Sequence, residues 1–83
     1  MPRYYFDIRD ENDLAVDEMG LELSNIQDVQ DEAARSLSGM ARDEVRKLGS
    51  DSHRSRRMAI EVRDDKGPVL EVKFTVEIEK KKR

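Results

Sequence analysis

His53 is the one histidine of the chain, and its side chain is the best suited to acid–base chemistry near neutral pH. General-base or nucleophilic catalysis needs a second group that holds the imidazole in place. The nearest such groups lie in the short polar segment around the histidine: Asp51, Ser52 and Ser55. The chain has no cysteine that could act as a nucleophile instead. We therefore expect an exposed histidine without a catalytic role, and no enzyme activity.

Carboxylates are dense between residues 10 and 18, which raises the question of a calcium site. An EF-hand loop needs glycine at its sixth position and glutamate at its twelfth. Counted from Asp10, those positions hold Ala15 and Leu21, so the motif is absent. The four glycines are too far apart to form a phosphate-binding loop. We expect no metal ion and no cofactor, and we interpret the carboxylates as a solvated loop.

Basic residues gather toward the C-terminus. Residues 1–53 carry six Lys and Arg against thirteen Asp and Glu, whereas residues 54–83 carry ten against six. A basic end on an acidic body is one pattern that contacts nucleic acid. The candidate contacts are Arg54, Arg56, Arg57, Lys80, Lys81, Lys82, Arg83 and the ring of Tyr5. Tyr5 is the one aromatic residue that we expect outside the core, whereas base-stacking platforms use several exposed rings.

The elements that must position these groups begin with a strand. The segment 3–9 alternates apolar and polar residues, which predicts a half-buried strand. The alternation breaks at residues 10–12 and resumes after them, which predicts a hairpin with a three-residue loop and Asn12 in the left-handed conformation. This register gives two apolar pairs, Ile8 with Leu14 and Phe6 with Val16.

A long helix is predicted between residues 26 and 48, where apolar residues recur at steps of three and four. Ser24 and Asn25 are both suitable N-caps, and Gly49 is suited to the position after the last turn. Gly39 lies mid-helix, where a missing side chain allows close approach to the sheet or to a partner helix.

A second hairpin is predicted after a polar loop at residues 50–55. The sequence Asp64-Asp65-Lys66-Gly67 is typical of a tight turn, and alternating strands flank it. The turn pairs Val62 with Leu70, Ile60 with Val72 and Met58 with Phe74 on the inner face, and Glu61 with Glu71 on the outer face. The last strand extends past its partner at Val76 and Ile78, so we expect it to pair with the first strand as well.

The predicted fold class is therefore α+β: a two-layer ββαββ domain with a four-stranded antiparallel sheet of two hairpins and one long amphipathic helix on one face. We expect a single domain over residues 1–79 and a mobile basic tail at 80–83. Hydrophobic residues make up 36% of the 83-residue chain, enough for one thin core that self-association would help to stabilise. No segment has the length and composition of a membrane span or a secretory signal, so we expect a cytoplasmic protein.

Four short motifs resemble a family of small alphaproteobacterial (rhizobial-type) proteins that is defined only as a domain of unknown function. They are MPRYYF at residues 1–6, DEMGLEL at 17–23, EAA at 32–34 and DDKG at 64–67. The resemblance extends over nearly the whole chain, but it rests on turn and strand residues and implies no activity. A more distant likeness in layout is to the N-terminal domain of HicB-type antitoxins, which bind a toxin and often DNA.

Two classes of function remain open. The first is a non-enzymatic protein-interaction or regulatory module, whose partner is another protein or a second copy of the chain. The thin core, Gly39 and Met40 on the helix, and an incompletely paired sheet edge favour it. The second is a nucleic-acid-binding accessory protein that uses the basic residues named above.

Overall fold

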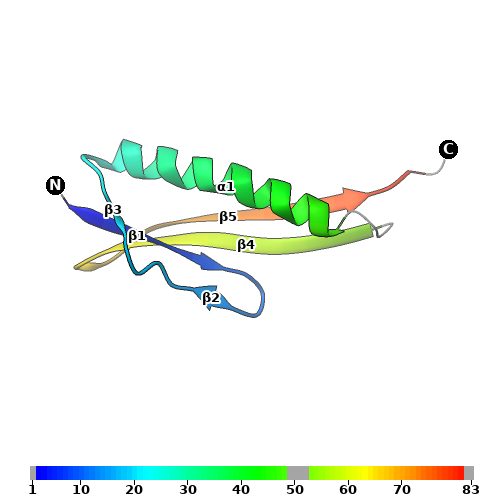
Figure 1. Cartoon of the computed structure of the whole chain (residues 1–83), viewed down its shortest axis with the longest axis horizontal. Coiled ribbons are helices and arrows are strands. Elements are labelled where there is room, and N and C mark those ends of the chain that lie inside the picture. Colours follow the sequence, from blue (N-terminus) through cyan, green and yellow to red (C-terminus); the bar gives the residue numbers. More distant parts are fainter. Residues whose placement is uncertain (1, 49–52, 82–83) are drawn as a thin grey trace.

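A computed structural model describes residues 2–48 and 53–81, in which one helix lies on one face of an antiparallel sheet (Figure 1). The elements are β1 (Arg3–Arg9), β2 (Leu14–Ala15), β3 (Leu21–Glu22), α1 (Ile26–Leu48), β4 (His53–Asp64) and β5 (Gly67–Glu79). The α+β class is confirmed, as are the bounds of the helix. Within the described residues, no helix is long and apolar enough to cross a membrane.

The sheet has five strands, so the ββαββ order and the count of four were wrong. The additional strand is β3, whose Leu21 and Glu22 pair with Tyr4 and Arg3. Gly20 adopts φ +70° just before this strand, a left-handed conformation that turns the chain back onto β1. Leu21 and Glu22, just before the helix, are therefore part of the sheet.

The strand order is β2-β1-β4-β5, and β3 also pairs with β1. The first strand therefore pairs with β4, and our expectation that it pairs with the last strand was wrong. The expectation assumed that the last strand extends past its hairpin partner. In the structure β4 already begins at His53, within the segment expected to be a loop, and it pairs with β5 as far as Glu79. This places β4 in the middle of the sheet and leaves β5 at its margin.

The first hairpin differs from its expected register by one residue. Arg9 lies opposite Leu14, so the expected pairs of Leu14 with Ile8 and of Val16 with Phe6 do not form. The Asp10 carboxylate accepts hydrogen bonds from the backbone N–H groups of residues 12 and 13, at 2.9 and 2.7 Å, and this side-chain turn needs a four-residue loop. No described residue other than glycine has positive φ, so the expected left-handed Asn12 was also wrong.

The second hairpin has the expected register. All three inner pairs between residues 58–62 and 70–74 form, as does the outer pair of Glu61 with Glu71. The Asp64 carboxylate accepts a hydrogen bond from the Lys66 backbone N–H at 2.8 Å, and Gly67 takes φ +131°. A bulge at Val62 and Arg63 adjusts the ladder next to this turn.

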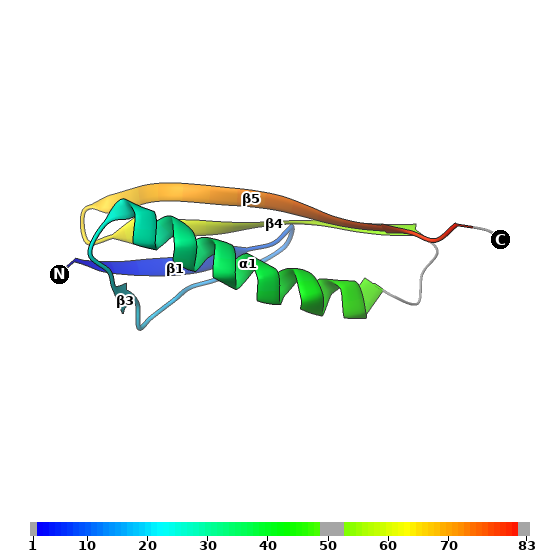
Figure 2. The same cartoon turned by 90° about the horizontal axis from the view of Figure 1, so that it is seen from above.

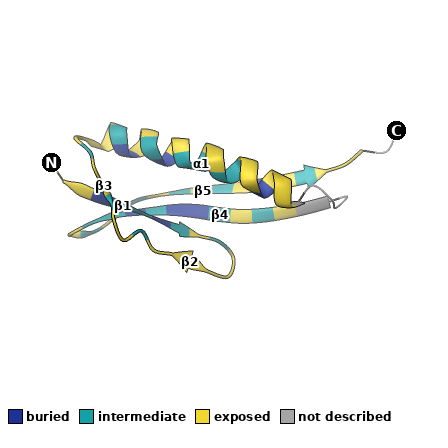
Figure 3. Ribbon diagram, in the orientation of Figure 1, coloured by how far each residue is buried: buried dark blue, intermediate teal, exposed yellow. Residues whose placement is uncertain are grey.

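The core lies between α1 and the centre of the sheet, as the dark ribbon segments of Figure 3 indicate. Val29, Ile60 and Val62 are almost completely buried there, and Tyr4 packs beside them. Asn25 caps the helix by accepting a hydrogen bond from the Asp28 N–H at 2.9 Å. The expected cap residue Gly49 lies outside the described residues.

Gly39 does not serve a close approach within the described chain. A Cβ atom built at this position meets nothing within 4 Å, and the residue is exposed. The expectation that Gly39 allows the helix to approach the sheet closely was therefore wrong.

Candidate interaction surface

The outer face of the sheet, away from the helix, carries an ion pair whose carboxylate is buried. Asp7 of β1 is only 6% exposed, and its Oδ2 atom accepts a hydrogen bond from Arg63 Nε at 2.8 Å. Its Oδ1 atom accepts one from the Asp17 backbone N–H at 2.9 Å. The pair therefore joins β1, β4 and the turn before β3, and it engages both oxygens of the Asp7 carboxylate.

Arg63 is the centre of this cluster. Its guanidinium also donates to the Asp17 carbonyl at 3.1 Å and lies 4.5 Å from the centre of the Tyr5 ring, a cation–π arrangement. The hydrogen bond to Asp7 raises the pKa of Arg63 against the opposing effect of burial, so its charge is permanent. The Tyr5 ring therefore already contacts Arg63 of the same chain on the outer face.

Asp17 organises the turn that leads into β3. Burial by itself raises its pKa, but hydrogen bonds from the backbone N–H groups of Gly20, Phe6 and Met19 outweigh this effect, and the net pKa lies below the ordinary value. The Asp17 carboxylate accepts all three of these hydrogen bonds, and together they hold the turn in place. We therefore assign Asp17 a structural role.

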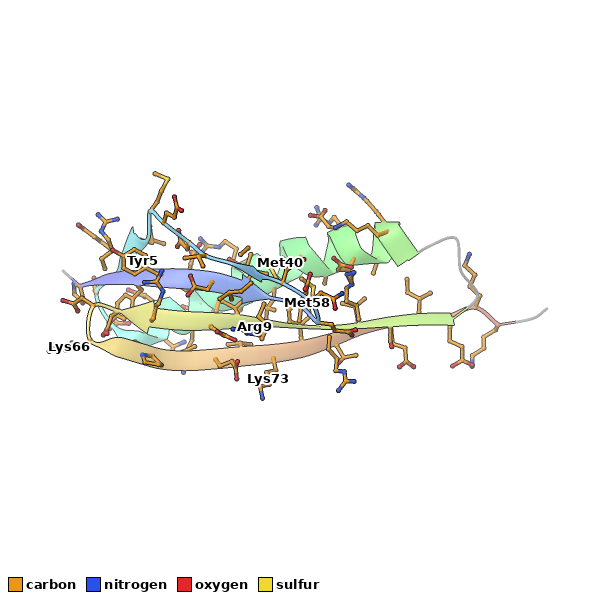
Figure 4. The ribbon with its side chains drawn as sticks, turned by 90° about the horizontal axis from the view of Figure 1, so that it is seen from below. Tyr5, Arg9, Met40, Met58, Lys66 and Lys73 are labelled. Atoms are coloured by element: carbon orange, nitrogen blue, oxygen red, sulfur yellow. The ribbon has the colours of Figure 1, made fainter. Side chains whose placement is uncertain are left out.

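An open groove of about 870 Å³ lies on the same outer face. Arg9 and Lys73 lie on this face, on either side of β4 (Figure 4). The charged lining consists of Arg9, Arg57 and Lys73 together with Asp10, Glu11 and Glu71. Because three cations face three anions, the groove does not present the one-sided positive field that binds a polyanion.

The sequence-predicted basic residues do not form one patch. Side chains alternate between the faces of a strand, so Arg56 of β4 lies on the helix side and Arg57 on the outer side. Arg56 Nε lies 3.4 Å from Glu44 Oε2 of the helix. Glu44 is 5% exposed, and Lys47 Nζ approaches its other oxygen at 3.6 Å. Arg56 therefore compensates a buried carboxylate, whereas the Arg57 side chain is exposed.

Tyr5 and the C-terminal tail lie at different ends of the molecule. Tyr5 pairs with Arg63, whereas the end of β5 pairs with His53, about 33 Å further along β4 at the usual rise per residue. Lys80 and Lys81 are exposed beyond β5, and Lys81 Nζ lies 3.0 Å from Glu79 Oε1. Lys82, Arg83 and the loop residues Asp51 and Ser52 lie outside the described residues, as do the side chains of His53 and Arg54.

The remaining feature of this surface is the margin of the sheet at β5. Neighbouring residues of a strand direct their N–H and C=O groups to opposite sides. The Phe6 N–H donates to the Asp17 carboxylate at 3.1 Å, on the side of β1 away from β4. Phe6 lies opposite Val62, which must then direct its own backbone groups toward Leu70 in β5. Counting on from Leu70, the odd-numbered residues of β5 direct their N–H and C=O groups away from β4.

A second hydrogen bond leads to the same assignment independently. The Arg57 N–H donates to Glu11 Oε1 at 3.2 Å, on the side of β4 away from β5. Arg57 lies opposite Thr75, so the backbone groups of Thr75 point away from β4 as well. No strand pairs with β5 on that side within the described residues. Glu71, Lys73 and Thr75 thus present main-chain donors and acceptors along an unpaired edge.

The other margins of the sheet are shorter or covered. Next to β1 lie β2 and β3, which are only two residues each, a length too short to template another strand. Beyond the end of β1, the exposed side of β4 is blocked in part by Glu11, which occupies the Arg57 N–H. The edge of β5, 13 residues long, is therefore the longest strand edge open to a partner in the described chain.

Metal chemistry has no assembled site here. No group of three or more His, Cys, Asp or Glu side chains among the described residues is arranged to hold a metal ion.

Comparison with known families gives one match, to Domain of unknown function (DUF6894), over residues 3–75. The chain belongs to the DUF6894 family. The comparisons find no match to this chain among curated proteins or solved structures.

The matched region of the DUF6894 domain begins with β1 and ends within β5. It therefore contains the Asp7–Arg63 pair and most of the open edge. The pair of Asp7 and Arg63 was not predicted from the sequence, because the register between β1 and β4 links residues 56 positions apart. The sequence also did not predict which strand lies at the margin, because this depends on the strand order. The one signal in the sequence was the length of the last alternating segment, which needs a partner along its whole span or leaves an edge open.

Proposed function

We propose that this DUF6894 domain is a non-enzymatic protein-binding module that accepts an extended strand along the edge of β5. The observation that carries the proposal is the orientation of Glu71, Lys73 and Thr75, whose main-chain groups point away from the sheet. Addition of a strand to such an edge is a common mode of peptide recognition, in which main-chain hydrogen bonds supply affinity and side chains supply selectivity.

The chemistry of the edge favours a partner with its own alternating pattern. On the helix side of β5, Val72, Phe74 and Ile78 are half-buried and would meet apolar side chains of an added strand. On the outer side Glu71 and Lys73 are exposed charges of opposite sign. We therefore expect a partner strand with apolar residues at every second position and charges of both signs between them.

The test uses a panel of synthetic peptides of about eleven residues, extended by design with alternating apolar and charged residues. Amide NMR signals of the full chain are followed during titration. We expect shifts to gather at Glu71, Lys73 and Thr75, and those amides to gain protection from hydrogen exchange. Shifts confined to the groove around Arg9 and Arg57, or no shift with any peptide, would contradict the proposal.

A matched pair of variants isolates the main-chain contribution. Thr75→Pro removes one outward N–H without removing a hydrogen bond to β4, because proline is tolerated at a strand edge. Thr75→Ala keeps that N–H and serves as the control. Peptide binding should be lost in the proline variant and retained in the alanine variant, while both unfold at similar denaturant concentrations.

Nucleic-acid binding is the second candidate, and the exposed positions of Arg57, Lys80 and Lys81 support it. A HicB-like antitoxin role would be a variant of this candidate. Titration with short DNA and RNA oligomers at low and moderate salt separates it from the first. Shifts at these three residues that weaken steeply as salt rises would favour nucleic acid over a peptide strand.

A further inference from the structure

We infer that the strand added to β5 is the β5 strand of a second copy of this chain, related by a two-fold axis through Val76. This inference rests on the proposed function, since it names the partner of the same edge. In a two-fold antiparallel pairing the axis lies midway between the two copies of one residue, which face each other. Residues equally spaced on either side of that residue then face one another across the two strands. Each choice of axis therefore fixes every cross-strand pair.

The charges on the outer side of β5 exclude most positions of the axis. An axis at Lys73 places that lysine opposite itself. An axis at residue 74 places Glu71 opposite Glu77, and one at residue 75 places Glu71 opposite Glu79. Like charges directly opposite destabilise a pair of strands. Among axes at residues 71 to 79, those at Val72 and Val76 are the two that place no like charges opposite one another within this range.

The axis at Val76 uses the regular part of the strand. It pairs Lys73 with Glu79 twice, once on each side, and places Glu71 opposite Lys81 where the chain continues past the strand. On the helix side it pairs Phe74 with Ile78, again twice. The axis at Val72 instead reaches Pro68 and the bulge near the turn, where the ladder is irregular and one N–H is missing. The charge pattern and the backbone together therefore favour Val76.

The shape of the sheet supports the same end of β5. Pairing of β1 with β4 ends where Arg9 meets Ala59, so residues 53–58 and 74–79 form a two-stranded ribbon that extends past β1 (Figure 1). A two-stranded ribbon by itself is only marginally stable in water. Pairing two ribbons through β5 gives a four-stranded sheet with both helices on one face.

The helix leaves room for this pairing. In Figure 2, α1 begins beside β5 near the hairpin turn and moves away from β5 toward its C-terminal end. The Val76 side chain is itself buried on the helix side, at 9% exposure, but the edge of the C-terminal part of β5 lies away from the helix axis. A second copy can approach this part of the edge in the plane of the sheet.

The absence of cysteine allows a direct test of the axis. In the full chain, Val76→Cys places two thiols opposite each other in a non-hydrogen-bonded pair, whose Cα atoms are about 4.5 Å apart and within disulfide range. Val72→Cys is the matched control, on the same strand and face. Under mild oxidation we expect the disulfide-linked dimer of Val76→Cys to form at least about tenfold faster than that of Val72→Cys, because pairing raises the effective concentration of the two thiols. Faster cross-linking at Val72 would overturn the axis.

A charge exchange tests the register without cysteine. Lys73→Glu turns both Lys73–Glu79 pairs into repulsive ones, and we expect sedimentation equilibrium to show self-association weakened by about tenfold, from two exposed pairs. Adding Glu79→Lys restores opposite charges and should restore association. A chain that stays monomeric at all concentrations, or a double variant that is not rescued, overturns the inference. If peptides of the panel still bind the edge of that monomer, the proposed function stands and the choice of partner fails alone.

Discussion

Replacement of Asp7 by alanine tests the central electrostatic contact of the sheet. The change removes the acceptor of Arg63 Nε and of the Asp17 N–H, both of which are within 3 Å of the carboxylate. Loss of one partner of a buried ion pair costs about 3–5 kcal/mol of stability. The Arg63 side chain is 38% exposed, so water solvates part of the orphaned guanidinium. We therefore expect the free energy of unfolding to fall by about 2–3 kcal/mol.

This loss is large for a domain of this size. A chain of 83 residues has a free energy of unfolding of roughly 4–12 kcal/mol. A loss of about 2–3 kcal/mol lowers the melting temperature by roughly 10–20 °C at this length. Urea unfolding at pH 7, followed by circular dichroism, measures the first quantity, and a thermal scan measures the second.

The control is the other charged contact on the same face. Glu61→Ala removes the partner of Arg9, but both side chains of that pair are substantially exposed, at 51% and 31%. The expected loss is therefore below about 1 kcal/mol. A double-mutant cycle with Asp7→Ala and Arg63→Ala then isolates the coupling. If Asp7→Ala costs no more than Glu61→Ala, or if the two losses in the cycle add within about 0.5 kcal/mol, our assignment of this pair is refuted.

Three further predictions concern the glycines, the loss of stability at acidic pH and the buried glutamate. Gly20→Ala should destabilise by about 2 kcal/mol, because it forces a left-handed alanine whose Cβ lies 2.9 Å from side-chain carbons of residues 3 and 5. Gly39→Ala should stabilise by about 1 kcal/mol in the same urea assay, and a destabilisation there would indicate a partner packed on the helix. The lowered pKa of Asp17 contributes stability that is complete above its unfolded pKa near 4 and is lost as pH falls through the lower folded pKa. Urea midpoints measured from pH 6 to 2 should therefore fall less steeply in Asp17→Asn, and an unchanged slope would refute the role of this group. Glu44→Leu should be neutral or stabilising by about 1 kcal/mol, whereas Arg56→Met should cost about 1–2 kcal/mol because it leaves the buried carboxylate with Lys47 alone; the reverse order in thermal melting would count against the pair.

Local chemistry was enough to predict the elements that depend on neighbouring residues. The helix begins and ends at the expected residues because its apolar period, its Asn25 cap and its charged ends all act within a few turns. The register of the second hairpin follows from the turn at residues 64–67, since a tight turn fixes every pair beyond it. These parts of the fold were predicted from sequence alone.

The first hairpin marks the limit of that reasoning. The alternation and the apolar pairs predicted a three-residue loop, whereas the structure has a four-residue loop. The Asp10 carboxylate decided for the longer loop by capping two backbone N–H groups. A local side-chain hydrogen bond thus outweighed the apolar pairing, at the expense of leaving Val16 55% exposed.

The sequence by itself determined the helix, the closing hairpin, the α+β class and the absence of any cysteine chemistry. Only the tertiary structure decided which strand lies in the centre, that Arg56 meets Glu44 of the helix, that Asp7 meets Arg63, and that β5 keeps an open edge. Each of these depends on contacts between residues far apart in the chain. The entropy of closing such long loops changes only slowly with their length, so no local pattern selects one pairing over another. The choice is made by which arrangement buries the apolar face and pairs the charges at the same time.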